Sequence, residues 1–285
     1  MIPRLFAALL LTALPLAAAA QDTLYFSAIP DEDETRLAER FGAVAEYLSE
    51  ELDVPVQFVP VKSYPAAVTA FRNDQVQLAW FGGLSGVQAR LLVDGARAIA
   101  QGDEDTSFVS YFIAHTDTGL ERSDDFPDAA RGMSFTFGAK TSTSGRLMPE
   151  YGIRENTGEA PEEFFSRVGF SGDHSQTLRL VASGAWQVGA LNFTVYDQAV
   201  ADGAPEIETA KVIWQTPPYP DYNWTIRGDV DARWGEGFAD RVQAALIGMD
   251  DPDLLAAFPR NAFIAAENDD YAPIEQVARE LDLLE

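Results

Sequence analysis

The sequence predicts an α/β protein whose two lobes are joined by a two-segment hinge. Short apolar segments rich in β-branched and aromatic residues alternate with amphipathic helical segments. The alternation restarts after a polar, Asp-rich loop at 116–131, and a Pro-rich connector at 216–220 precedes the final segments. A chain that builds one α/β unit, enters a second and returns to the first forms two lobes with a cleft between them.

The first unit is predicted from strands and helices in strict alternation. Leu37, Phe41, Val44 and Leu48 recur at the spacing of one helix face. The order βαβαβα implies a parallel sheet covered on both faces. The predicted strands are 24–29, 54–59 and 76–81, and the other helical patterns lie at 67–71 and from 84 to 91.

The second unit repeats this alternation, and the closing segment returns to the first. One longer predicted strand, 108–115, precedes the polar loop. The predicted strands after the loop are 133–137, 168–170, 188–191 and 212–214, and the predicted helices of the second unit are 145–151, 174–183 and 195–200. The closing segment has an extended stretch at 223–226 and helical patterns at 238–246, 254–258 and 274–284. We therefore expect residues 21–114 and 223–285 to form the first lobe and residues 115–222 to form the second.

Residues 1–20 have the pattern of a secretory signal peptide. Arg4 precedes a short apolar run that ends in three alanines, as at a small-residue cleavage site. The alternative is a membrane anchor, but the run is short for a span and Pro15 interrupts it. The chain has no cysteine, which excludes attachment to a lipid through a thiol. Cleavage before Gln21 would release an exported protein.

Composition excludes several classes of function. The formal net charge of −25 argues against nucleic acid as a partner, because that binding needs clustered Lys and Arg. The absence of cysteine excludes a disulfide scaffold and a Cys-based zinc site. No nucleophile elbow, P-loop or zinc-protease motif is present. We expect no enzyme activity, no cofactor and no metal.

A run of hydroxyl residues follows the predicted strand 133–137. Thr141, Ser142, Thr143 and Ser144 precede Gly145 and an apolar helical turn. A strand–loop–helix junction presents free backbone N–H groups and the positive end of the helix dipole, which together suit a small anion. Ordinary helix capping is the alternative, although capping needs one such residue and not four.

Two further junctions share this geometry in the first unit. Phe81 and Gly82 end a buried strand in a glycine-rich turn, and Ser85 could donate a hydrogen bond there. A tight turn without a ligand is the alternative. Tyr64 stands beside Pro65 at a predicted helix start and offers a phenolic donor, unless it merely packs.

Two candidates come from the second unit. His174 follows a Gly-containing turn before a helix, where it could donate to an anion, although a lone histidine is more often structural. Asn192 ends a predicted strand, where it could face the cleft or serve as a turn residue. Lys62 and Arg146 are possible positive charges nearby, with solvated positions as the alternative.

In this order the segments resemble the phosphate/phosphite/phosphonate-type periplasmic binding proteins of ABC importers. The segments that carry the resemblance are Ala28-Ile29-Pro30, Ser63-Tyr64-Pro65-Ala66-Ala67, Gln77-Leu78-Ala79-Trp80-Phe81-Gly82, Ser142-Thr143-Ser144-Gly145 and Phe170-Ser171-Gly172-Asp173-His174. The resemblance implies a type II periplasmic binding fold that closes like a hinge on a small oxyanion. It also implies a membrane permease as partner, a periplasmic location and a monomer.

Departures from that family affect the expected ligand. Gly83 and Gly86 stand where the family often has Pro and Tyr, and Ser175 replaces an acidic residue after the histidine. A site with only neutral donors suits a fully deprotonated tetrahedral dianion. The stretch Trp80–Gly86 is similar to the selenate-type subgroup, so selenate stands beside phosphonate, phosphite and phosphate. A periplasmic ligand sensor for a membrane receptor is the alternative function, and a secreted hydrolase is the third.

Overall fold

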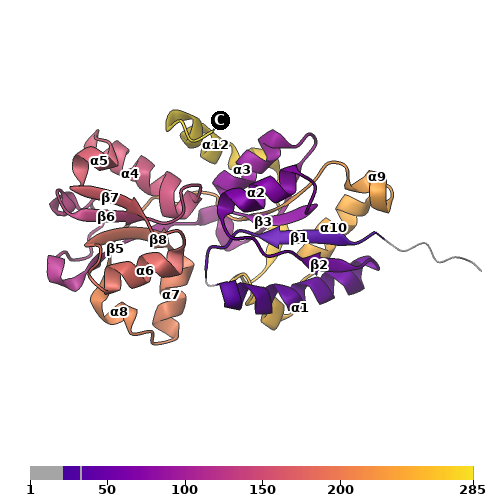
Figure 1. The fold of residues 1–285 in the computed structure, drawn as a ribbon, viewed down its shortest axis with the longest axis horizontal. Coiled ribbons are helices and arrows are strands. Elements are labelled where there is room, and N and C mark those ends of the chain that lie inside the picture. Colours follow the sequence, from indigo (N-terminus) through magenta and orange to yellow (C-terminus); the bar gives the residue numbers. More distant parts are fainter. Residues whose placement is uncertain (1–21, 33, 285) are drawn as a thin grey trace, which may run out of the picture.

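The computed structural model describes residues 22–32 and 34–284, and it shows two lobes side by side (Figure 1). The signal-peptide prediction for residues 1–20 lies outside the described residues. Among the helices that are described, none combines the length and hydrophobicity needed to cross a membrane.

Lobe 1 is built from both ends of the chain around a six-stranded sheet of order β11-β4-β10-β3-β1-β2. Its first segment contains β1 (Leu24–Ala28), α1 (Glu34–Leu52), β2 (Val56–Phe58), α2 (Tyr64–Arg72), β3 (Leu78–Phe81), α3 (Gly83–Leu92) and β4 (Arg97–Gly102). Its second segment adds β10 (Asn223–Ile226), α9 (Val230–Trp234), α10 (Phe238–Ile247), α11 (Pro252–Leu255), β11 (Phe263–Ala265) and α12 (Ala272–Glu280). The sheet is mixed rather than parallel throughout, because β10 and β11 return antiparallel to their neighbours.

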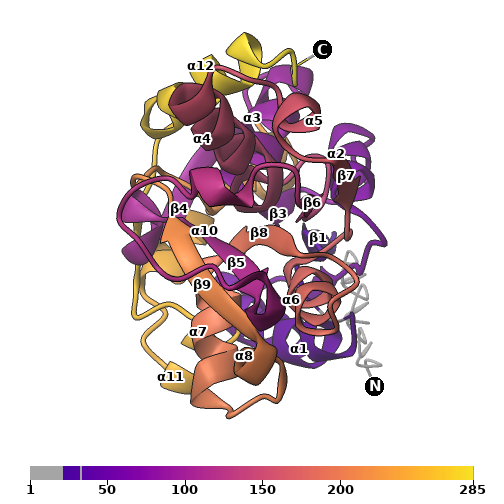
Figure 2. The ribbon, with the colours of Figure 1, turned by 90° about the vertical axis from the view of Figure 1, so that its left-hand side faces the viewer.

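Lobe 2 is formed by the middle of the chain around a five-stranded sheet of order β7-β6-β8-β5-β9. Its elements are β5 (Ser110–His115), β6 (Ser134–Phe137), the π-helical turn η4 (Thr143–Leu147), α4 (Met148–Thr157), α5 (Pro161–Phe164), β7 (Arg167–Phe170), α6 (His174–Ala182), β8 (Val188–Asn192), α7 (Phe193–Ala201), α8 (Glu206–Thr209) and β9 (Ala210–Gln215). Helices α4 and α5 lie on one face of this sheet and α6 to α8 on the other (Figures 1 and 2).

The first crossing between the lobes comes earlier than the sequence predicts. Residues 110–114 were expected in lobe 1, but β5 pairs along its length with β8 and β9 of the second sheet. The boundary at residue 114 is therefore wrong, because a long apolar strand does not reveal from its sequence which sheet it joins. The two crossing segments, 103–109 and 216–222, also pair with each other through reciprocal N–H···O bonds of 2.9 Å between Phe108 and Tyr219.

Both lobes share one topological feature that positions the site. In lobe 1 the chain goes from β1 outward to the edge strand β2, then back across to β3. In lobe 2 it goes from β6 to the edge strand β7, then back to β8. Right-handed crossovers in opposite directions place successive helices on opposite faces of the sheet. They leave a crevice at the carboxyl ends of β1 and β3, and another at those of β6 and β8.

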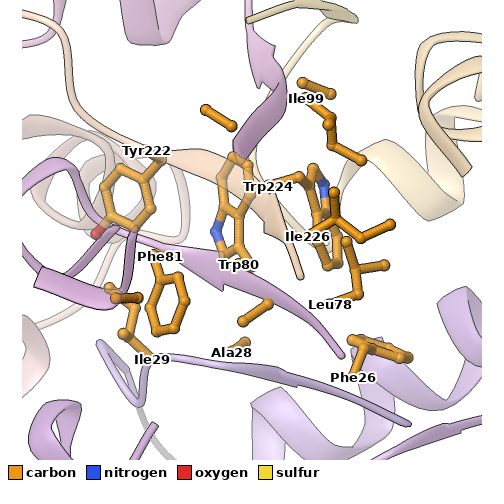
Figure 3. Close-up of a cluster of buried hydrophobic side chains, with 14 of the residues drawn as sticks. Phe26, Ala28, Ile29, Leu78, Trp80, Phe81, Ile99, Tyr222, Trp224 and Ile226 are labelled. Atoms are coloured by element: carbon orange, nitrogen blue, oxygen red, sulfur yellow. The ribbon is translucent and has the colours of Figure 1, made fainter. Parts of the chain in front are cut away.

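The core of lobe 1 is aromatic and extends to the hinge (Figure 3). Trp80 of β3 contacts Trp224 of β10 and Phe258, with ring centroids 5.5 and 5.3 Å apart. Tyr222, the last residue before β10, stacks on Trp80 at 5.5 Å with 24° between the ring planes. Such aromatic pairs contribute about 0.5–1.5 kcal/mol beyond their buried area. The hinge residue Tyr222 is thus held in place by the lobe 1 core.

Candidate ligand-binding cleft

The crevices of the two lobes face each other across a cleft. A cavity of about 600 Å³ is lined by Pro30, Glu32 and residues 61–65 of lobe 1 and by Ala139, Lys140, residues 170–173 and Arg179 of lobe 2. Tyr64 is part of its lining, and the hydroxyl-rich loop at 141–144 directly follows Lys140. The loops that sequence analysis selected therefore meet at the boundary between the lobes.

The hydroxyl run combines capping with contacts across the cleft. Ser142 caps η4, since its Oγ accepts a hydrogen bond of 2.9 Å from the Gly145 amide. Thr143 instead reaches lobe 1, where its Oγ1 accepts from the Leu84 amide at 3.0 Å. The Thr143 hydroxyl also lies beside the Asp221 carboxyl and acts to lower the pKa of that group. One hydroxyl caps the helix, as the alternative interpretation holds, and the next joins the two lobes.

Ser144 and Thr141 complete this loop. The Ser144 carbonyl accepts a 2.7 Å hydrogen bond from the Ser110 hydroxyl, which also lies 2.6 Å from the Tyr219 hydroxyl. Because the Ser110 proton is directed to the Ser144 carbonyl, Tyr219 donates to Ser110. Within the described chain the buried Thr141 Oγ1 has no hydrogen-bond partner. A backbone carbonyl of this loop is therefore anchored by Ser110, while the Thr141 hydroxyl is left without a hydrogen bond.

Tyr64 is buried with its polar atom unused. It is the first residue of α2, which Ser63 caps by accepting from the Ala66 amide at 3.3 Å. Only 1% of Tyr64 is exposed, and its hydroxyl forms no hydrogen bond of normal geometry with the described residues. Burial raises the pKa of Tyr64 well above its usual value, so the phenol keeps its proton. An unpaired buried hydroxyl costs about 1–3 kcal/mol, which a ligand oxygen would relieve.

The β3–α3 junction brings its backbone close to lobe 2. A Cβ added to Gly82 would lie 3.2 Å from Thr143 Oγ1 and 3.3 Å from Asp221 Oδ1, so a side chain there would crowd both groups. The Ser85 hydroxyl donates to the Gly82 carbonyl at 3.1 Å and is therefore engaged within its own turn. Phe81 is fully buried and packs edge-on against Phe71 in the core of lobe 1.

His174 is a neutral donor whose tautomer can be assigned. It is the first residue of α6, and Asp173 performs the capping by accepting from the Gln176 amide at 2.6 Å. Burial lowers the pKa of His174 to about 3, so its ring is uncharged. Nδ1 accepts from the Asn192 amide at 3.2 Å, which leaves the proton on Nε2. That Nε2–H lies 3.5 Å from Ser144 Oγ, beside the hydroxyl run.

Asn192 connects lobe 2 to the hinge. Its Oδ1 caps α7 by accepting from the Val195 amide at 2.9 Å, and its Nδ2 donates to the Tyr222 hydroxyl at 3.0 Å. Tyr222 in turn donates to Asp31 Oδ2 at 2.8 Å, and the His174 amide donates to the Asp31 carbonyl at 3.1 Å. Asn192 thus serves as a cap and as a link between the lobes, and its contact with a ligand remains a prediction.

Two carboxyl groups at the cleft contradict the expectation of neutral donors only. Asp221 is 1% exposed; its Oδ1 accepts from the Gly83 amide at 2.8 Å, and its Oδ2 has no partner within the described residues. Burial raises the pKa of Asp221 to about 7, and burial likewise raises the pKa of Asp31 to about 7. The acid absent at Ser175 is therefore supplied by other segments. The sequence signal was a single aspartate between two tyrosines, Tyr219 and Tyr222, in the Pro-rich connector.

Comparison with known proteins identifies the class. The model of the family "ABC transporter, phosphonate, periplasmic substrate-binding protein" matches residues 26–271. The chain is 38% identical over 266 residues to PhnD1 of Prochlorococcus marinus strain MIT 9301, described as a probable ABC transporter phosphite binding protein. That alignment covers 91% of this chain and 90% of PhnD1. The chain therefore belongs to the family of phosphonate-type periplasmic substrate-binding proteins of ABC transporters, and it is a binding protein, not an enzyme.

Solved structures agree with this assignment. The structure of PhnD1 in complex with methylphosphonate superposes with a TM-score of 0.87 and covers 91% of this chain and 98% of its own. A binding protein component of an ABC phosphonate transporter from Pseudomonas aeruginosa shares the fold with a TM-score of 0.79 at 21% identity, over 90% of this chain and 85% of its own. The type II periplasmic binding fold is confirmed, and the family implies a periplasmic location.

Proposed function

We propose that this protein captures a small phosphorus oxyanion of the phosphite or methylphosphonate class between its lobes and delivers it to a membrane permease. Similarity to PhnD1, whose structure contains methylphosphonate, supports the ligand class. The observation that carries the proposal is a set of three buried polar atoms without partners among the described residues, Tyr64 Oη, Thr141 Oγ1 and Asp221 Oδ2, one from each lobe and one from the hinge. Tyr64 lines the interlobe cavity, and the charge of Asp221 acts on its phenol. Export through the predicted signal peptide and action as a monomer belong to the same proposal.

The donors divide between the lobes. Tyr64 and the turn at Gly82 belong to lobe 1, and the hydroxyls of 141–144 and the His174 Nε2–H belong to lobe 2. The starts of α2 and α6 add backbone N–H groups and favour negative charge. An anion obtains this full donor set only when the lobes are together, so its binding shifts the population toward the closed form. The Thr143–Leu84 hydrogen bond is a contact of that form.

Asp221 favours a phosphorus oxyacid over selenate or sulfate. Its pKa of about 7 lies close to the second ionisation of phosphite and alkylphosphonates, so the carboxyl group and the ligand can share one proton. Sulfate and selenate carry no proton at neutral pH, so in their complexes Asp221 alone would have to supply the shared proton. Above pH 7 that requirement costs about ten-fold in affinity for each pH unit. The expectation of a fully deprotonated dianion rested on a site with only neutral donors. The Asp221 carboxyl group replaces it with a preference for a ligand that can carry a proton.

Calorimetry of ligand-stripped protein tests the proposal. The titrants are phosphite, methylphosphonate, phosphate, sulfate and selenate, each at pH 7 and pH 8. We expect phosphite or methylphosphonate to bind most tightly, and we expect sulfate and selenate to weaken between the two pH values. Absence of binding by all the phosphorus compounds would refute the ligand class. A tighter complex with selenate at both pH values would restore the dianion hypothesis.

A further inference from the structure

Lysine is rare in this chain, and its distribution is uneven. The sequence contains three lysines, Lys62, Lys140 and Lys211. Lys62 and Lys140 both line the 600 Å³ cavity that Tyr64 also lines, one from each lobe. Lys211 lies on β9, away from this cavity, and is exposed. Two of the three lysines of a strongly acidic protein therefore flank the mouth of its interlobe cleft.

The acidic residues beside the two lysines are engaged elsewhere. Glu32 forms an ion pair with Arg40 at 3.2 Å, and Asp173 caps α6 through the Gln176 amide. Within the part of the chain that the structure describes, no carboxylate forms an ion pair with Lys62 or Lys140. Both lysines are exposed at the cavity, so their charges face the solvent through which a ligand arrives.

Lys140 has a defined neighbour at this mouth. Its Nζ lies 5.4 Å from the centre of the Phe170 ring, which is 40% exposed and lines the same cavity. Phe170 itself stacks on buried Phe137, with ring centroids 5.6 Å apart and 25° between the planes. A cation over an aromatic face is stabilised by about 0.5–1 kcal/mol at exposed sites. The lysine is thereby held at the rim of the cavity.

This placement addresses an electrostatic problem. A protein of net charge −25 repels an anion at long range, although screening limits that repulsion to about 8 Å at physiological salt. Within that distance the nearest charges decide the field that an approaching ligand experiences. A cleft focuses the field of the charges that line it and raises the association rate of a ligand of opposite sign. This cavity is lined by three cationic side chains, Lys62, Lys140 and Arg179, against two carboxylates.

We propose that Lys62 and Lys140 form an electrostatic gate that accelerates capture of the anion at the cleft mouth. The inference rests on the proposed function, because it requires an anionic ligand in this cleft. The two lysines act on the approach of the ligand and are not part of the buried donor set. Their removal lowers the association rate constant and leaves the dissociation rate constant nearly unchanged.

Stopped-flow kinetics with methylphosphonate tests the gate. The proteins are the unaltered chain, K62Q, K140Q, the double variant and the matched control K211Q, each from low salt to 1 M salt. At low salt we expect each substitution at the mouth to slow association roughly two- to five-fold, since a single charge acts on an anion across the ~30 Å screening length at 0.01 M salt. K211Q should match the unaltered protein, and all five proteins should converge at 1 M salt.

The outcomes separate this proposal from the proposed function. An unaltered association rate in the double variant at low salt overturns the gate and leaves the ligand assignment intact. A loss that resides in the dissociation rate also overturns it, because the lysines would then be direct ligand contacts. Absence of methylphosphonate and phosphite binding in the unaltered protein refutes the ligand class, and the gate with it. The charge-reversed variant K140E should slow association further than K140Q, in the same salt-dependent way.

Discussion

Substitution of Asp221 by Asn is the sharpest test of how the site selects its ligand. Asn preserves the size of the side chain and retains an oxygen that can accept from the Gly83 amide, now 2.8 Å from Oδ1. It replaces the unpartnered Oδ2 with an NH₂ group that cannot hold or share a proton. The variant should therefore lose the preference for a protonated phosphorus oxyacid without losing the shape of the site.

The magnitude follows from one hydrogen bond. A hydrogen bond to a charged group contributes about 1.5–3 kcal/mol, and a neutral one contributes about 1 kcal/mol. Exchange of the first for the second reduces the preference for methylphosphonate over sulfate by about 0.5–2 kcal/mol, which is roughly 2- to 30-fold. The pH dependence of sulfate affinity should weaken as well, since Asp221 is gone and Asp31 alone keeps a pKa of about 7.

Calorimetry at pH 6, 7 and 8 measures both effects, with methylphosphonate and sulfate as titrants. Thr136→Val, a change at a buried residue of β6 in the sheet of lobe 2, is the control for a general loss of packing. An Asp221→Asn variant with an unchanged ligand ratio and an unchanged pH profile would refute the shared proton. A uniform loss for both anions would show that Asp221 only supports the turn at Gly83.

Three further expectations follow from the same contacts. Thr143→Val leaves the Leu84 amide without its acceptor in the closed form, and an unpaired buried group costs about 1–3 kcal/mol. Ligand affinity measured by calorimetry should therefore fall roughly ten-fold. Undiminished affinity would contradict a role of Thr143 in closure. Tyr64→Phe removes an unpaired hydroxyl, so ligand-free melting should be unchanged or higher while affinity drops; a lower melting temperature would show that the hydroxyl already stabilises the empty protein. Asp31 and Asp221 keep their protons up to about pH 7 when folded but ionise near pH 4 when unfolded, so these two groups lower the free energy of unfolding as pH rises through that window. Urea denaturation should accordingly show a steeper fall between pH 4 and 7 for the ligand-free protein than for Asp221→Asn, and equal slopes would contradict the raised pKa.

Regular patterns allowed much of the fold to be predicted. Leu37, Phe41, Val44 and Leu48 repeat at helical spacing, and all four are buried on α1. The central strand β3 is apolar throughout, β8 is free of polar side chains up to its last residue, Asn192, and both are buried, as strands covered on both faces are. Strand β4 was missed because its sequence, RAIAQG, contains few of the β-branched and aromatic residues that mark strands.

The sequence by itself determined the class of this protein, and it predicted the loops of its binding site. Strand–loop–helix junctions are local features, and the residues of a junction stay together however the chain folds. It could not determine which hydroxyl crosses the cleft, since Ser142 and Thr143 are adjacent and chemically alike. Only the tertiary structure separated them, because it placed the Leu84 amide and Asp221 beside Thr143.

The acidic character of the site was likewise decided by the tertiary structure alone. Asp31 and Asp221 are 190 positions apart; Asp31 begins an acidic run at 31–34, and Asp221 stands alone between two tyrosines. Their altered pKa values arise from burial, which exists only after two lobes and a hinge enclose them. The sequence therefore predicts an anion junction, and the packing of the lobes gives the two carboxyl groups beside it their raised pKa values.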